Sequence, residues 1–181
     1  MHTPSLYRID FCAKFMRDLV PSMSHLELKA VLFALDKHNG QLRKYTGEHY
    51  ILHPMRVAQM LRYLPGSTVT VLQAAWLHDI VQHTSTTMQE IEEKFGVEVT
   101  ALLSLREEDL GKPRAAVHNL KVAGILDNVG EAALYAPDRA EAKRYLEEKQ
   151  ALLKVLTSGD TGLLTEAVRA VENGLQLLAA R

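Results

Sequence analysis

The segment Ala74–Thr84, AAWLHDIVQHT, places a histidine and an aspartate side by side within an apolar run. Charged side chains are rarely buried without a partner, so His78 and Asp79 require either several hydrogen bonds or a cation. A divalent metal would satisfy both side chains at once, because imidazole nitrogen and carboxylate oxygen are both metal ligands. From this segment alone, a buried His–Asp hydrogen bond without a metal is an equal alternative.

The composition around this segment is that of an ordinary globular protein. The chain has 181 residues, of which 47% are hydrophobic and 24% charged, and its formal net charge is −1. We expect one domain over residues 1–181 and no nucleic-acid partner. A single cysteine, Cys12, excludes an internal disulfide and a cysteine-rich metal site. Apolar stretches fall far short of the ~20 residues of a membrane span, and the N-terminus lacks a signal-peptide pattern. We therefore expect a cytoplasmic protein that binds no membrane.

The periodicity of the rest of the chain predicts an all-α fold. Prolines and glycines fall between segments with helical spacing, and no stretch alternates as a strand would. Ser24 and Thr87 each precede a glutamate by three residues, the spacing of a capping box, so we expect helices to begin there. The expected helices cover residues 9–19, 25–40, 53–63, 69–83, 88–96, 115–129, 140–156 and 163–180, and the one over 140–156 is the longest clear amphipathic helix.

Two further histidines have ordinary explanations when each is taken alone. His38 ends a predicted helix, where the negative end of the helix dipole favours a histidine. His53 precedes a proline at a predicted helix start, a place where a cap or a surface residue is more common than a ligand.

Five segments, taken together in their order and spacing, indicate a protein family more specifically than any single histidine does. They are KHNGQLRKYTGEHYILHPMRVAQML, AAWLHDIVQHT, TMQEIEEKFGVEV, LKVAGILDN and RYLEEKQALLKVL. Over about residues 26–156, the chain resembles the HD-domain hydrolases of the Rel/Spo alarmone family, and among these the stand-alone small alarmone hydrolases. The resemblance implies an all-helical HD-domain bundle, with the C-terminal helices continuing to residue 181.

The resemblance also implies a chemistry, the metal-assisted removal of pyrophosphate from the 3′ position of the guanine nucleotide ppGpp. The residues that match the family's metal ligands are His53, His78 and Asp79, and the usual metal is manganese. Mixed nitrogen and oxygen ligation suits manganese, zinc or iron better than calcium. Such a metal withdraws charge from a phosphate ester and makes a bound water more acidic.

Four more positions match nucleotide-binding residues of the family. Arg43 and Lys44 match residues that meet the guanine base and the phosphates. Asn128 matches an asparagine near the sugar, and Tyr145 matches a tyrosine that helps to close the pocket. Without the surrounding motifs, the basic pair is a solvated turn, and Tyr145 is equally a residue of ordinary helix packing.

Three departures from the family pattern fall on catalytic positions. Gln82 and His83 replace a glutamate and an aspartate that handle the attacking water and the leaving-group protons. Glutamine can hold a water but cannot take its proton, whereas His83 could act as a base near neutral pH or as a ligand. Gly124 replaces the fourth metal ligand, and Ile125 replaces an arginine of the pocket.

A replacement for the fourth ligand would come from a nearby side chain. Asp127 lies three residues after Gly124, on roughly the same side of the helix and one turn along. His83, near the His–Asp pair, is the other main candidate, and His118 is a third. Alternatively, Asp127 is an ordinary residue near the end of the helix, and its carboxylate bonds to water or to a nearby lysine.

Three functions follow from these observations. The first is a metal-dependent phosphohydrolase with a remodelled site, acting on ppGpp or a related guanine nucleotide. The second is a degenerate hydrolase that still binds a nucleotide. The third is a scaffold for a protein partner, for which the shortened segment over residues 106–114 is a candidate surface. A homo-oligomer is left open, and we expect ppGpp hydrolysis to be weak or absent.

Overall fold

The computed structural model describes residues 20–104 and 114–180, and these residues form helices and their connections. The only β pairing in these two ranges is an isolated bridge between Leu42 and His49. The predicted all-α fold is therefore confirmed. Cys12, the expected helix over residues 9–19 and most of the segment 106–114 lie outside the described residues.

The elements are η1 (Val20–Ser22), α2 (His25–Lys37), α3 (Leu52–Arg62), α4 (Val69–Leu77), α5 (Ile80–His83), α6 (Met88–Phe95), α7 (Val97–Leu103), α8 (Ala115–Tyr135), α9 (Arg139–Leu153) and α10 (Thr161–Ala180).

Local sequence signals fix the starts of several helices. The hydroxyl of Ser24 accepts the N–H of Glu27 at 3.1 Å at the start of α2. Thr87 caps α6 in the same way, through the N–H of Glu90 at 3.1 Å. Pro54 lies in the first turn of α3, where its missing N–H costs no helical hydrogen bond. Both predicted N-caps are thereby confirmed.

The helix expected over residues 69–83 is interrupted at the His–Asp pair. Leu77 ends α4 and Ile80 begins α5, with Asp79 between them at φ −102° and ψ −7°. In an unbroken helix, adjacent side chains point about 100° apart. At the interruption, Tyr50 donates a hydrogen bond to the Asp79 carboxylate at 2.7 Å and so helps to hold this side chain in place.

Two other helices differ from the sequence-based expectation. Gly96, at φ +87°, ends α6 and allows α7 to begin directly, a conformation that glycine adopts without a steric penalty. The segment 140–156 is not the longest helix, because α9 has 15 residues whereas α8 has 21. Ala132 and Ala133 continue the buried face of α8 past the expected end.

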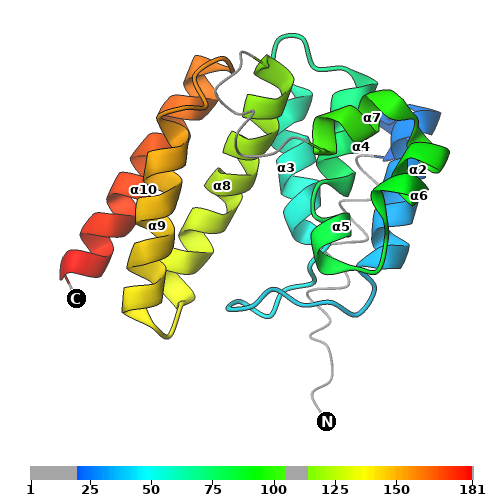
Figure 1. Cartoon of the computed structure of the whole chain (residues 1–181). Helices are drawn as coiled ribbons and strands as arrows, with labels where there is room; N and C mark the ends of the chain where they lie inside the picture. Colours follow the sequence, from blue (N-terminus) through cyan, green and yellow to red (C-terminus); the bar gives the residue numbers. More distant parts are fainter. Residues whose placement is uncertain (1–19, 105–113, 181) are drawn as a thin grey trace.

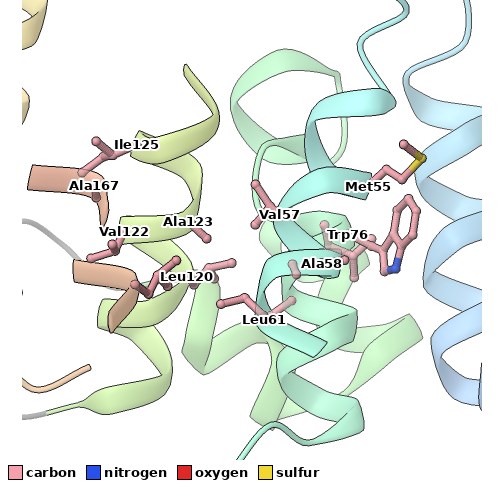
Figure 2. Packing of buried hydrophobic residues seen from close by; sticks show 14 of the residues in the cluster. Met55, Val57, Ala58, Leu61, Trp76, Leu120, Val122, Ala123, Ile125 and Ala167 are labelled. Carbon is pink, nitrogen blue, oxygen red and sulfur yellow. The ribbon is translucent and has the colours of Figure 1, made fainter. Parts of the chain in front are cut away.

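The helices form two groups that share α8 (Figure 1). α8, α9 and α10 pack side by side, and α3 packs against both α8 and α4. In Figure 2, Leu61 of α3 points toward Leu120 and Ala123 of α8, whereas Met55 and Trp76 lie toward α2. This packing brings the start of α3, the α4–α5 turn and the middle of α8 together. Of the helices described, none has the length and apolarity to cross a membrane.

Candidate metal centre and adjacent cavity

Three predicted metal ligands converge where α3, the α4–α5 turn and α8 meet. Nε2 of His53 lies 3.1 Å from Nε2 of His78 and 3.3 Å from a carboxylate oxygen of Asp79. Nε2 of His78 lies 3.4 Å from the other oxygen of that carboxylate. One ligand atom from each of the three residues fits within a mutual distance of 4.8 Å. Two imidazole nitrogens and one carboxylate form a donor set suited to a transition metal.

The second nitrogen of each histidine ring fixes the orientation of the first. Nδ1 of His78 donates to the carbonyl oxygen of Ala75 at 2.8 Å, and Nδ1 of His53 donates to Asp127 at 2.7 Å. Each neutral ring then carries its lone pair on Nε2. Two such lone pairs face each other across 3.1 Å, which is unfavourable without a proton or a cation between them. Partners behind the ligating histidines are typical of metal sites.

Asp127 lies behind His53 and not among the converging ligand atoms. Its carboxylate pairs with Nδ1 of His53 and, at 3.1 Å, with Nη2 of Arg56. The structure thus gives Asp127 the position of an orienting partner, in contrast to the expectation of a fourth ligand. Asp127 lies about 4.5 Å of helical rise beyond Gly124, and its carboxylate contacts two residues of α3. The cation beside it is thus an arginine and not the lysine of the alternative expectation.

The other two candidates for the fourth ligand lie apart from the converging ligands. The exposed ring of His83 tilts against Tyr50, with 5.1 Å between the ring centroids. His118 is buried, and its Nδ1 lies 2.8 Å from the hydroxyl of Ser158 near the α9–α10 connection. Neither histidine belongs to the group of atoms that could share one ion in the described residues.

Gly124 faces the converging ligands directly. A Cβ atom at this position would lie 3.7 Å from Nε2 of His78, which is an ordinary van der Waals distance. A side chain could therefore begin at residue 124, beside the ligand atoms, without displacing His78. The three ligands present fit a metal, and the fourth position is open.

The charges of these residues shift their pKa values. Burial alone would raise the pKa of Asp79, but the histidine charges and hydrogen bonds from His53 and Tyr50 lower it well below its usual range. Burial opposes protonation of His53, yet hydrogen bonds to Asp127 and Asp79 raise its pKa overall. For His78 burial prevails, and its pKa is lowered. These shifts favour an ionised Asp79 and a neutral His78, the forms in which both residues can ligate a metal, whereas a protonated His53 would release its proton when a metal binds.

A cavity of about 600 Å³ opens beside the converging ligands. All six residues that the sequence assigned to catalysis or nucleotide binding line it, namely Arg43, Lys44, Gln82, His83, Asn128 and Tyr145. Burial raises the pKa of Tyr145 to about 12, so its hydroxyl stays protonated. Gln82 and His83 are both exposed at the rim.

The two predicted basic residues are held by carboxylates that the sequence reading missed. Arg43 is only 7% exposed, donates to Asn128 at 2.7 Å and forms an ion pair with Glu131. Lys44 is exposed, and its ammonium group lies 2.8 Å from Glu141, which raises the pKa of the lysine. Glu131 lies three residues after Asn128 on α8. This spacing could have predicted that Glu131 lines the cavity beside Asn128, because residues three apart share a helix face.

Tyr50, which the sequence analysis did not single out, packs between His38 and Asp79. The ring of Tyr50 stacks on His38 with 4.8 Å between centroids, while its hydroxyl holds Asp79. His38 does cap the end of α2, but it is buried, which lowers its pKa, and it bonds Gln41 at 2.8 Å. At the end of α2, the side chain of His38 thus also contacts Gln41 and Tyr50. Tyr50 precedes His53 by three residues, and this spacing could have indicated it.

Comparison with known proteins agrees with this arrangement. Residues 30–107 match the family described as HD domain. Human guanosine-3′,5′-bis(diphosphate) 3′-pyrophosphohydrolase MESH1 is 42% identical over 97 residues, which are 52% of this chain and 54% of that protein. The chain is similar to the HD-domain hydrolases of the Rel/Spo alarmone family. The Escherichia coli bifunctional (p)ppGpp synthase/hydrolase SpoT is 43% identical over 75 residues, which are 41% of this chain and 10% of SpoT.

A solved structure shows the same fold over most of the chain. Its title is "A metazoan ortholog of SpoT hydrolyzes ppGpp and plays a role in starvation responses". The TM-score is 0.76 at 23% sequence identity, over 84% of this chain and 98% of that chain. In sequence, the chain spans about half the length of the MESH1 proteins that it matches. The Rel/Spo-type HD fold is thus supported by sequence and structure together.

Proposed function

We propose that this protein is an HD-type phosphohydrolase that binds a divalent metal through His53, His78 and Asp79. In this proposal, ppGpp or a related guanine nucleotide binds in the adjacent cavity, and catalysis is weakened by substitutions at the site. The observation that carries the proposal is the pair of imidazole Nε2 atoms 3.1 Å apart, each with its Nδ1 donating elsewhere. Manganese is the metal that the Rel/Spo resemblance favours, and the donor set suits it.

The chain's own residues orient this candidate site. Asp127 and Arg56 hold the ring of His53, the carbonyl of Ala75 holds His78, and Tyr50 holds Asp79. A bound metal would polarise a phosphate ester and lower the pKa of a water.

The nucleotide would lie along α8 and α9. Arg43 and Asn128 are joined by a hydrogen bond of 2.7 Å and form one wall of the cavity. A guanidinium plane can stack on a base, and an amide can bond a sugar hydroxyl. Tyr145, protonated and half-buried, lines the same cavity from α9 beside Asn128.

Two features support weak or absent hydrolysis. Gln82 lines the cavity but has no group that takes a proton at neutral pH. Gly124 provides no anionic ligand where a side chain would fit beside His78. These features also favour the second candidate function, a protein that binds the nucleotide without hydrolysing it. A protein partner and a cytoplasmic location remain predictions from the sequence.

Calorimetric titration with manganese tests the metal site. We expect wild type to bind about one ion and His78→Ala to lose that binding, because three ligands become two. His25→Ala is the matched control, since His25 is exposed at the start of α2, and it should bind as wild type does. A wild type that binds neither manganese, zinc nor iron would overturn the proposed metal site. Titration of the metal-free protein with ppGpp and GDP tests nucleotide binding separately.

A further inference from the structure

The positive charges of the cavity fall into two groups. At one end, Arg43 is paired with Glu131, and Lys44 is paired with Glu141. Lys121 of α8 and Lys149 of α9 also line the cavity. Among the residues that the structure describes, neither of these lysines has a carboxylate within ion-pair distance.

Helix geometry places the second group of charges beside the converging ligands. Lys121 precedes Gly124 by three residues on α8, and Gly124 faces His78. α9 returns alongside α8 after a short turn (Figure 1). Lys149 follows Tyr145 by one turn on α9, and its ammonium group lies 5.0 Å from the centre of the tyrosine ring. Both lysines are half-buried, and Lys121 lies close enough to His78 for its charge to lower the pKa of that histidine.

The two groups differ in their capacity to attract an anion. A phosphate that approaches Arg43 or Lys44 must compete with a carboxylate that already bonds the cation. A half-buried cation without such a partner gains more from an anionic ligand, because burial has removed part of its hydration. The most negative part of a ligand should therefore lie against Lys121 and Lys149.

Ile125 leaves α8 without a cation at one position that lines the cavity. This residue lines the cavity between Gly124 and Asn128, is 6% exposed and carries no charge. The Rel/Spo resemblance places an arginine at this position, so α8 lacks one cation. Lys149 approaches the same cavity from the neighbouring helix, and a lysine stem can pack along apolar surface while its ammonium group reaches a polar ligand.

We propose that Lys121 and Lys149 form the phosphate-binding subsite of the cavity, with Lys149 supplying from α9 the charge that Ile125 does not supply from α8. This inference rests on the nucleotide-binding cavity proposed above. It orients the ligand, with its phosphates toward the metal end and its base toward Arg43.

Calorimetry on the metal-free protein tests this subsite, with inorganic pyrophosphate, GDP and guanosine as the probes. Lys149→Gln and Lys121→Gln should each weaken pyrophosphate and GDP binding about tenfold, which is the loss of roughly one charge-assisted hydrogen bond. Guanosine binding should be unchanged. Lys143→Gln is the matched control, because Lys143 is exposed on α9 and pairs with Glu147 at 3.6 Å. It should behave as wild type.

A rescue variant separates a charge effect from a folding effect. Ile125→Lys placed in the Lys149→Gln background returns a cation from α8 and should recover most of the lost pyrophosphate affinity. Wild-type pyrophosphate affinity in both Lys121→Gln and Lys149→Gln would overturn the subsite, even if GDP binds well. Lysine-dependent pyrophosphate binding without any guanosine or GDP binding would support the subsite and overturn the proposed guanine nucleotide. A wild type that binds none of the three probes would overturn both.

Discussion

At the scale of single residues, Gly124 lies beside the three converging ligand atoms and has no side chain to offer a metal. A Cβ at this position would lie 3.7 Å from Nε2 of His78, an ordinary van der Waals distance, so a side chain can begin there without a shift of the backbone. A single substitution should therefore complete the ligand set.

We predict that Gly124→Asp raises manganese affinity by at least tenfold, because it adds an anionic ligand to three existing ones. The change should also favour the helix by a few tenths of a kcal/mol, since glycine is a poor helix former. Calorimetric titration measures the affinity. Gly130→Asp is the matched control, because Gly130 is exposed on the same helix with open space around it. If wild type already binds manganese as tightly as Gly124→Asp, another group serves as the fourth ligand.

Turnover should depend on three positions acting together. We predict that Gln82→Glu with His83→Asp leaves ppGpp hydrolysis weak, and that adding Gly124→Asp raises it toward about 1 per second, an ordinary enzyme rate. Residues that act as a unit are non-additive in this way. Release of pyrophosphate with manganese present is the measurement. A wild-type rate of about 1–10 per second would contradict the proposed weakening at the site.

At the scale of elements, the contact between α3 and α8 positions a ligand. Asp127 on α8 bonds His53 on α3 and is itself paired with Arg56, also on α3. The pair of helices thus holds the imidazole ring from behind. Removal of an orienting partner should lower metal affinity less than removal of a direct ligand does.

We predict that Asp127→Asn lowers manganese affinity about 10- to 100-fold without abolishing binding, the usual range for a residue behind a ligand. His53→Ala should abolish binding, because it removes a ligand. Competition with a metal-sensitive dye would report both affinities. Asp36→Asn on the exposed side of α2 is the control. If Asp127→Asn proves as severe as His53→Ala, Asp127 contacts the metal itself.

At the scale of the whole molecule, one buried ion pair joins three helices of the N-terminal part. Glu27 of α2 is 2% exposed, pairs with Arg62 of α3 and accepts a hydrogen bond from Trp76 of α4 at 3.1 Å. Its position three residues after Ser24 predicts a reciprocal capping role. Its side chain instead stabilises the packing of α2 against α3 and α4.

We predict that Glu27→Gln lowers the free energy of unfolding by about 3 kcal/mol, because it leaves the Arg62 guanidinium buried without a counter-charge. Urea denaturation followed by circular dichroism measures it. Glu92→Gln, at an exposed position on α6, should change stability by less than about 0.5 kcal/mol. A double change of Glu27→Met and Arg62→Met should recover part of the loss, since no charge is then left buried. Equal stability of Glu27→Gln and wild type would show that the pair contributes nothing net.

The sequence by itself determined the helical class, the N-caps at Ser24 and Thr87, and the three residues whose ligand atoms meet. These features depend on short spacings, because capping and helical periodicity act over three or four residues. The organisation of residues 1–181 as one domain remains a prediction.

Tertiary structure alone decided which side chains surround those residues. His53 meets Asp127 from 74 positions away, Arg43 meets Asn128 from 85, and Lys44 meets Glu141 from 97. Such partners are chosen by the packing of α8 and α9 against α3 and the loop before it, and no local periodicity encodes that packing. The apolar helical pattern of residues 69–83 did not predict the break at Asp79 either. A hydrogen bond from Tyr50, in the turn before α3, helps to hold the Asp79 side chain there. The pairing of Arg43 with Glu131 and of Lys44 with Glu141 is likewise a property of the folded chain.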